Sequence, residues 1–192
     1  MAGMSDTRHA LFLLASTRAA GVVGNTEALA RSAAAHLPAG STQTWRHLHG
    51  LVLPPFEDHR HDIGSYPAPT GDLALLLDGL LAATDIVFVA PVYWYSLPAP
   101  LKAFVDHWSA FLRVPGLDFK ARMAGKRLWL ISTSGNREKA QPTIDTVALI
   151  AGFMGMAWGG ALWGLGGAPG VVAADAVAQQ AATSFLTGPT AG

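Results

Sequence analysis

The segment from Ile86 to Trp108 constrains the fold more than any other part of the sequence. It opens with five consecutive apolar residues that end at Ala90, and Pro91 then leads into three adjacent aromatic residues and a helical pattern. A strand that is apolar on both faces belongs in a parallel sheet that helices cover on both sides. Ligands of such sheets bind beyond the carboxyl ends of the strands. The aromatic residues therefore lie where a ligand is expected, and they favour a flat, conjugated ligand.

Strand and helix patterns alternate along the whole chain. Apolar runs and helical periodicity predict strands at residues 10–15, 42–48, 86–90, 127–132 and 156–162, and helices at 25–37, 71–83, 98–112, 142–154 and 172–185. This alternation predicts an α/β fold with one doubly wound, five-stranded parallel sheet and helices on both faces. We expect the flavodoxin-like strand order 2-1-3-4-5, with the ligand between the first and third strands. No linker interrupts the pattern, so residues 1–192 are predicted to form a single domain.

The composition narrows the classes of function. The chain has 192 residues, no cysteine and a formal net charge of zero. The lack of cysteine excludes disulfides, iron–sulfur clusters and thiolate chemistry. A zero net charge gives no indication of nucleic acid or an acidic membrane surface as a partner. Only 14% of the residues are charged, against about a quarter in typical domains. We therefore expect part of the surface to be buried in a homodimer or homotetramer.

One stretch has features of a membrane helix. Residues 146–174 carry no charge and contain two Gly-x-x-x-Gly motifs, which are typical of helices that associate in membranes. Glycines crowd the second half of this stretch, however, and it divides into a helix pattern followed by a strand pattern. The apolar run at residues 11–15 is too short for the core of a signal peptide. We therefore expect no membrane span and a cytoplasmic protein.

The loop after the first strand has the features of an anion site. Ser16 and Arg18 are followed by two glycines, and Asn25 and Thr26 stand at the start of the next helix. Backbone N–H groups and the dipole at a helix N-terminus favour an anion, and Arg18 can add a two-pronged contact. The loop lacks the lysine of a P-loop and the dinucleotide fingerprint, so it suits a terminal monophosphate. The alternative is an ordinary helix capped by Asn25 or Thr26.

Two patterns resemble those of a known family. The patterns S-x-R and G-N-T-E-A-L-A, within residues 16–30, are similar to the phosphate loop of the NADPH-dependent FMN reductase and multimeric flavodoxin-like NAD(P)H oxidoreductase family. The patterns A-x-D-I-V-F-x-x-P-V-Y-W and L-K-x-F-x-D, within residues 83–106, are similar to its second flavin loop and the following helix. The resemblance implies a non-covalently held FMN that NADH or NADPH reduces. It also implies a small electron acceptor, such as a quinone, a free flavin, or an azo or nitro aromatic compound.

The resemblance further implies which residues form the FMN site. The phosphate would be held by Ser16, Arg18, Asn25 and Thr26, the edge of the isoalloxazine ring would be lined by Pro91, Val92, Tyr93, Trp94 and Tyr95, and the pyrimidine end would be completed by Ser134, Gly135 and Asn136. N–H donors of Gly135 and Asn136 would stabilise the negative charge that reduction adds to the ring. No side chain is assigned as an acid or base, because hydride transfer through a flavin need not use one. Some relatives carry a cysteine cluster after the second strand, which this chain lacks.

Other interpretations of the sequence lead to different functions. A metal site is suggested by His47, His49, His59 and His61, but no carboxylate pattern accompanies them, and we expect no metal. The motif Gly164-x-Gly-Gly167 lacks the helix signature of a nucleotide loop and is interpreted as the turn after the fifth strand. A flavodoxin-type electron carrier is the alternative to an enzyme, but such carriers are usually strongly acidic, unlike this chain. A non-catalytic protein on the same fold is a third hypothesis.

Overall fold

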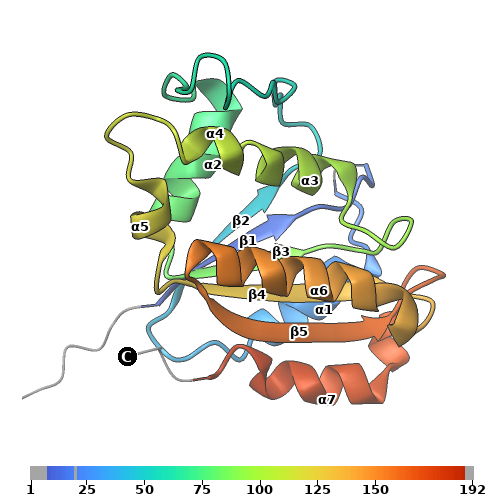
Figure 1. Cartoon of the computed structure of the whole chain (residues 1–192). Coiled ribbons are helices and arrows are strands. Elements are labelled where there is room, and N and C mark those ends of the chain that lie inside the picture. The colour runs from blue at the N-terminus through green and yellow to red at the C-terminus, as the bar shows by residue number, and fades with distance from the viewer. Residues whose placement is uncertain (1–7, 20, 189–192) are drawn as a thin grey trace, which may run out of the picture.

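One parallel sheet forms the centre of the protein. The structure is a computed structural model that describes residues 8–19 and 21–188. Its strands are β1 (His9–Leu14), β2 (Thr42–His47), β3 (Asp85–Val89), β4 (Arg127–Ser134) and β5 (Ala157–Leu165). They pair in the order β2-β1-β3-β4-β5, and every pair is parallel (Figure 1). The predicted flavodoxin-like strand order is therefore confirmed.

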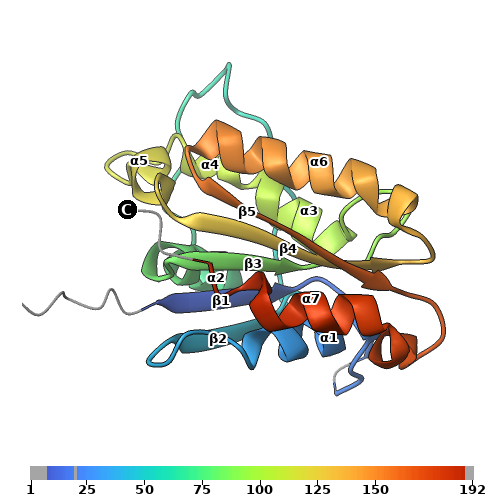
Figure 2. The same ribbon diagram turned by 90° about the horizontal axis from the view of Figure 1, so that it is seen from below.

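Helices cover both faces of this sheet. On one face lie α1 (Asn25–Ala34), the short 3-10 helix η1 (Val171–Ala174) and α7 (Ala176–Phe185). The other side carries α2 (Gly71–Ala82), α3 (Ala99–Asp106), α4 (Trp108–Phe111), α5 (Phe119–Met123) and α6 (Arg137–Met154). Figure 2 shows α1 and α7 side by side, and these two helices are in direct contact. This contact brings the segment after β5 close to the start of α1.

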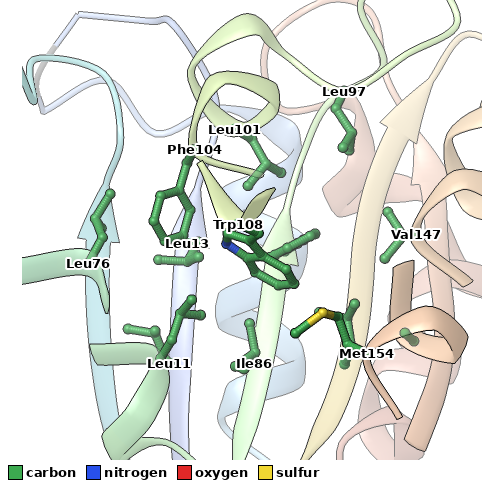
Figure 3. Packing of buried hydrophobic residues seen from close by; sticks show 14 of the residues in the cluster. Leu11, Leu13, Leu76, Ile86, Leu97, Leu101, Phe104, Trp108, Val147 and Met154 are labelled. Carbon is green, nitrogen blue, oxygen red and sulfur yellow. The ribbon is translucent and has the colours of Figure 1, made fainter. Parts of the chain in front are cut away.

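The central strands are apolar on both faces because alternate side chains enter different clusters. Leu11 and Leu13 of β1 belong to the larger cluster, beneath α2, α3, α4 and α6. Figure 3 shows these two leucines with Ile86 of β3 and the indole ring of Trp108. Phe12 of β1 points the opposite way, into the cluster beneath α1 and α7. Burial on both sides makes the sheet a rigid base for the loops at its carboxyl edge.

Several helix boundaries differ from the expected ones. Helix α6 begins at Arg137 rather than 142, because the side chain of Asn136 accepts a hydrogen bond from Lys139 N and caps the helix. The predicted helix 172–185 is divided into η1 and α7, because the Asp175 side chain accepts from Ala178 N and starts a new helix. The predicted helix 98–112 forms α3 and α4, which meet at His107. The short helix α5 was not predicted.

At the amino edge of the sheet, opposite its carboxyl edge, a buried carboxylate joins neighbouring strands. The side chain of Asp85 is fully buried and lies 2.7 Å from Arg8 Nη2 and 2.8 Å from Arg127 Nε. Trp129 Nε1 also donates to Asp85, at 2.9 Å. Burial by itself would raise the pKa of this carboxyl group, but the hydrogen bonds from Arg8, Trp129 and Arg127 outweigh it and hold the pKa of Asp85 below its ordinary value of 3.8. This network ties the starts of β1, β3 and β4 together.

A membrane-crossing helix is not found in the described parts of the chain, because none of the helices there is both long and apolar enough. The uncharged stretch 146–174 divides into the end of α6, the strand β5 and η1.

Candidate functional site

Four loops at the carboxyl edge of the sheet enclose one cavity. They follow β1, β3, β4 and β5, and the cavity between them has a volume of about 260 Å³. It lies where ligands bind in parallel sheets of this topology. Its lining residues are Ser16, Arg18, Gly24, Asn25, Thr26, Glu27, Pro91, Val92, Tyr93, Thr133, Ser134, Gly135, Gly166 and Gly167. The cavity brings together most of the residues that the sequence assigned to one site, although Trp94, Tyr95 and Asn136 do not line it.

The start of α1 presents free backbone donors to this cavity. The N-cap residue is Gly24, and no side chain caps the helix, so the alternative of a cap by Asn25 or Thr26 is wrong. The first backbone hydrogen bond of the helix runs from Ala28 N to Gly24 O. Among the described residues, the N–H groups of Asn25, Thr26 and Glu27 have no assigned acceptor. These donors and the helix dipole favour an anion at this end.

Arg18 lies over the same helix start. A Cβ atom at Gly24 would come within 3.1 Å of Arg18 Nε, so the glycine allows the arginine to approach this closely. The Arg18 side chain is exposed and can turn toward an anion in the cavity. The one acidic side chain in the lining, Glu27, is paired with Arg31 through an Oε1–Nη2 distance of 2.5 Å. The balance of charge at this end therefore favours a negatively charged ligand.

The side chains of Asn25 and Thr26 are already engaged within the protein. Asn25 Nδ2 donates to Ala168 O at 3.0 Å, and its Oδ1 accepts from Gly170 N at 2.9 Å. The hydroxyl groups of Thr26 and Thr133 lie 2.5 Å apart and share a hydrogen bond. Sequence reasoning assigned these two residues to the phosphate by type. In the structure, their main-chain N–H groups are the parts that lack an assigned partner.

The aromatic loop after β3 turns sharply at its tip. Tyr93 N donates to Ser96 O at 3.2 Å, and Ser96 N donates to Tyr93 O at 3.1 Å. Trp94 and Tyr95 between them have φ angles of 51° and 62°, the left-handed region that type I′ turns require. Positive φ is strained for such bulky residues and is most often found at functional sites. Tyr93 lines the cavity, whereas Trp94 is 94% exposed and projects into solvent.

The end of β4 and the loop after it form another wall of the cavity. Ser134 Oγ donates to Asn136 O at 2.5 Å and accepts from Trp163 Nε1 at 2.8 Å, so its hydroxyl group holds the turn in place. Trp163 is partly buried, and this hydrogen bond fixes its indole ring against the turn. Within the described chain, no acceptor is assigned to the N–H groups of Gly135 and Asn136. Gly135 lines the cavity, so its N–H group can serve a ligand there, whereas Asn136 lies outside the lining.

Sequence reasoning missed some residues of the cavity wall, namely Gly24, Glu27, Thr133, Gly166 and Gly167. The first two belong to the G-N-T-E pattern, which was noticed but not assigned residue by residue. The last two belong to the glycine motif after the fifth strand, which was interpreted as a turn only. Among residues 8–19 and 21–188, no group of three or more His, Asp or Glu side chains is arranged so that it could hold a metal ion. His59 instead contacts Asp62 and Glu57, which raise its pKa.

The fold and the site agree with the relationships of the sequence. A family model described as "Flavodoxin-like fold" matches residues 8–187, and the chain belongs to this family. The Bacillus subtilis (strain 168) protein named "Putative NAD(P)H-dependent FMN-containing oxidoreductase YwqN" is 32% identical over 166 residues. These residues make up 85% of this chain and 90% of YwqN.

Two further comparisons support the family. An FMN-dependent NADH:quinone oxidoreductase of Pseudomonas putida is 33% identical over 91 residues, which span 42% of this chain and 43% of that protein. The solved structure of the Trp repressor binding protein from Bacillus subtilis has a TM-score of 0.70 and 26% identity to this chain. The match covers 95% of this chain and 99% of the solved one. The architecture is therefore shared over almost the whole length.

Proposed function

We propose that this protein is an FMN-dependent NAD(P)H oxidoreductase that passes electrons to a small acceptor, such as a quinone, a flavin, or an azo or nitro aromatic compound. The observation that carries the proposal is a single cavity with an anion site at one end, formed by Arg18 and the start of α1, and with Tyr93 and the Gly135 turn among its other walls. YwqN, whose name includes FMN and NAD(P)H but no acceptor, is similar over most of its length. Bound in this cavity, FMN would supply the two-electron redox chemistry that the proposed reaction needs.

The residues present fit FMN. A terminal phosphate needs donors and positive charge, which the free N–H groups at residues 25–27 and the Arg18 guanidinium provide. Pro91, Val92 and Tyr93 form an apolar and aromatic wall suited to a flat ring. The N–H group of Gly135, which lines the cavity, can donate to the negative charge that would develop on reduction. We assign no acid or base side chain.

The alternative is an electron carrier of the flavodoxin type, which binds FMN but does not react with NAD(P)H. Carriers of this type usually rely on a strongly acidic surface to meet basic partners. The formal net charge of this chain is zero, with 13 acidic and 13 basic residues. This balance favours a small-molecule acceptor over a protein partner.

One anaerobic titration separates these functions. The purified protein is loaded with FMN and mixed with NADH or NADPH while the flavin absorbance is followed. Bleaching that reverses on adding a quinone supports the enzyme. FMN that binds but is never bleached by either nucleotide favours the carrier. A protein that does not bind FMN refutes both, and Arg18→Ala serves as the matched variant with a weakened phosphate site.

We also propose that the protein is cytoplasmic and forms a homodimer or homotetramer. A cytoplasmic location would give it direct access to NADH and NADPH. The support for association is an apolar groove of about 350 Å³ between α4 and α6. Leu149 and Phe153 on its rim are 74% and 61% exposed, which is unusual for side chains of this size. Light scattering gives the mass: a value near the chain mass of 20.1 kDa would contradict association.

A further inference from the structure

We propose that the loop after β5, residues 166–170, is a further binding segment for the phosphate end of FMN, and that Asn25 is the positioning residue that holds this loop against the site. The inference rests on the proposed function. It assigns a role to the glycine motif after the fifth strand. It also changes the expected role of the Asn25 side chain, from a direct phosphate ligand to a support for a second wall of the cavity.

The loop reaches the site because of how the helices pack. In the sheet, β5 is separated from β1 by β3 and β4, so the two strands do not bring their loops together by pairing. The helices that follow them, α1 and α7, lie against one face and contact each other (Figure 2). The start of α1 also contacts η1, which follows the loop. Gly166 and Gly167 consequently line the same cavity as Gly24 and Thr26.

Asn25 ties this loop to the start of α1 with both ends of its amide. Its Nδ2 donates to Ala168 O at 3.0 Å, and its Oδ1 accepts from Gly170 N at 2.9 Å and from Val172 N at 3.5 Å. Asn25 is only 7% exposed, so water competes little for these bonds. Helix α1 does not need this amide for capping, since Gly24 is its N-cap. The amide is therefore used to position the loop.

The glycines allow the loop to lie close to β4. Gly166 N donates to Ser134 O at 2.8 Å, and a Cβ atom at Gly166 would lie 3.0 Å from Ser134 N and 3.2 Å from Thr133 Cβ. The nearest of these atoms belongs to the backbone of a central strand, which cannot easily move away. Gly167 follows at φ 145°, and no acceptor is assigned to its N–H within the described chain. The loop thus adds a closely fitted wall and a free main-chain donor to the anion end.

The chain on both sides of the loop is held by contacts from residues outside the cavity lining. Gln179 Nε2 donates to Val172 O at 2.9 Å, and Leu165 N donates to the Asp175 carboxylate at 2.8 Å. Gln179 lies on α7 and is not part of the cavity wall. It therefore offers a way to loosen the loop without changing any residue of the site itself.

The test combines binding with hydrogen exchange. Dissociation constants of FMN and riboflavin are measured by fluorescence quenching for the wild type, Asn25→Ala and Gln179→Ala. Exchange at residues 166–172 is measured in the cofactor-free proteins. We expect faster exchange in both variants. For Asn25→Ala we expect the dissociation constant of FMN to rise about tenfold, the equivalent of about one hydrogen bond. The dissociation constant of riboflavin should rise less. Gln179→Ala should also raise the dissociation constant of FMN, but by a smaller factor.

The control is Thr183→Ala, which removes a hydroxyl that donates to Gln180 O on α7, outside the cavity lining, and should change nothing. Weaker FMN binding with unchanged loop exchange in Asn25→Ala would mean that Asn25 contacts the phosphate directly. Faster exchange with unchanged FMN binding would show that the loop is not part of the site. Either result overturns the inference while the wild type still binds FMN. A wild type that does not bind FMN refutes the proposed function itself. If Asn25→Ala does not fold, Gln179→Ala decides.

Discussion

Replacing Asp85 by asparagine should destabilise the protein strongly without altering its shape. Asp85 is the shared acceptor for Arg8, Arg127 and Trp129, and both arginines are only 5% exposed. Asparagine keeps the volume and one acceptor oxygen but removes the negative charge. The arginines then remain buried without a carboxylate, a change that typically costs about 3–5 kcal/mol. The remaining side-chain oxygen and the carbonyl groups of residues 186 and 188 still accept hydrogen bonds from the arginines. We therefore expect the free energy of unfolding to fall by about 3 kcal/mol, the lower end of this range.

The effect is measured by urea and thermal unfolding. For a domain of this size, each kcal/mol shifts Tm by about 2–4 °C, so the expected decrease is about 6–12 °C. The difference should also depend on pH. Because the folded-state pKa of Asp85 is lowered from 3.8, its charge contributes stability at neutral pH, and this contribution is lost as the pH falls below the ordinary carboxyl range. Wild type and Asp85→Asn should therefore converge in stability in acid.

Asp106→Asn is the matched control. Asp106 forms an ion pair of 2.6 Å with Lys102, but the two side chains are 41% and 52% exposed. An exposed pair at this spacing contributes less than about 0.5 kcal/mol. Equal losses for the two variants, or a loss below about 1 kcal/mol for Asp85→Asn, would refute the reasoning from burial. A difference between wild type and Asp85→Asn that stays constant down to strongly acid pH would refute the assigned ionisation.

Two further predictions concern the site. Arg18→Ala should lower the affinity for FMN by about tenfold, as expected for one charge-assisted hydrogen bond. Fluorescence titrations should show a nearly unchanged affinity for riboflavin. Equal losses of affinity for both flavins would remove Arg18 from the phosphate site. Trp94→Gly should leave FMN affinity within about twofold and should not lower Tm, because Trp94 does not line the cavity and glycine adopts its φ of 51° without strain. Trp94→Gly should raise KM for aromatic acceptors in steady-state assays. A large loss of FMN affinity would instead place the Trp94 indole against the isoalloxazine ring.

Much of the candidate site could be predicted from the sequence because its signals are local. The apolar run from Ile86 to Ala90 indicates a strand buried on both faces, and β3 is buried throughout. Glycines, Arg18 and a helix start following the first strand indicate an anion site, and the structure places them around one cavity. Once the strand order was inferred, the loops after the first, third and fourth strands had to meet at one edge.

The tertiary structure decided which part of each residue is available to a ligand. The amide of Asn25 finds its acceptor 143 residues away, at Ala168, and the hydroxyl of Thr26 finds its partner at Thr133. Helical and strand periodicity reports whether a side chain is buried, but not which distant loop lies beside it. The same holds for Trp94, which carries the residue type of a ring contact but is turned outward by the positive φ angles of its turn.

The sequence by itself therefore determined the fold class, the edge of the sheet where the site lies and the kind of ligand that the site suits. Each of these follows from patterns within short segments and from the topology that they imply. Only the tertiary structure revealed that Gly166 and Gly167 line the cavity, since their place depends on the packing of α7 against α1. It also assigned Asn25 to the support of that loop, because a polar side chain bonds to whichever groups the folded chain brings within reach.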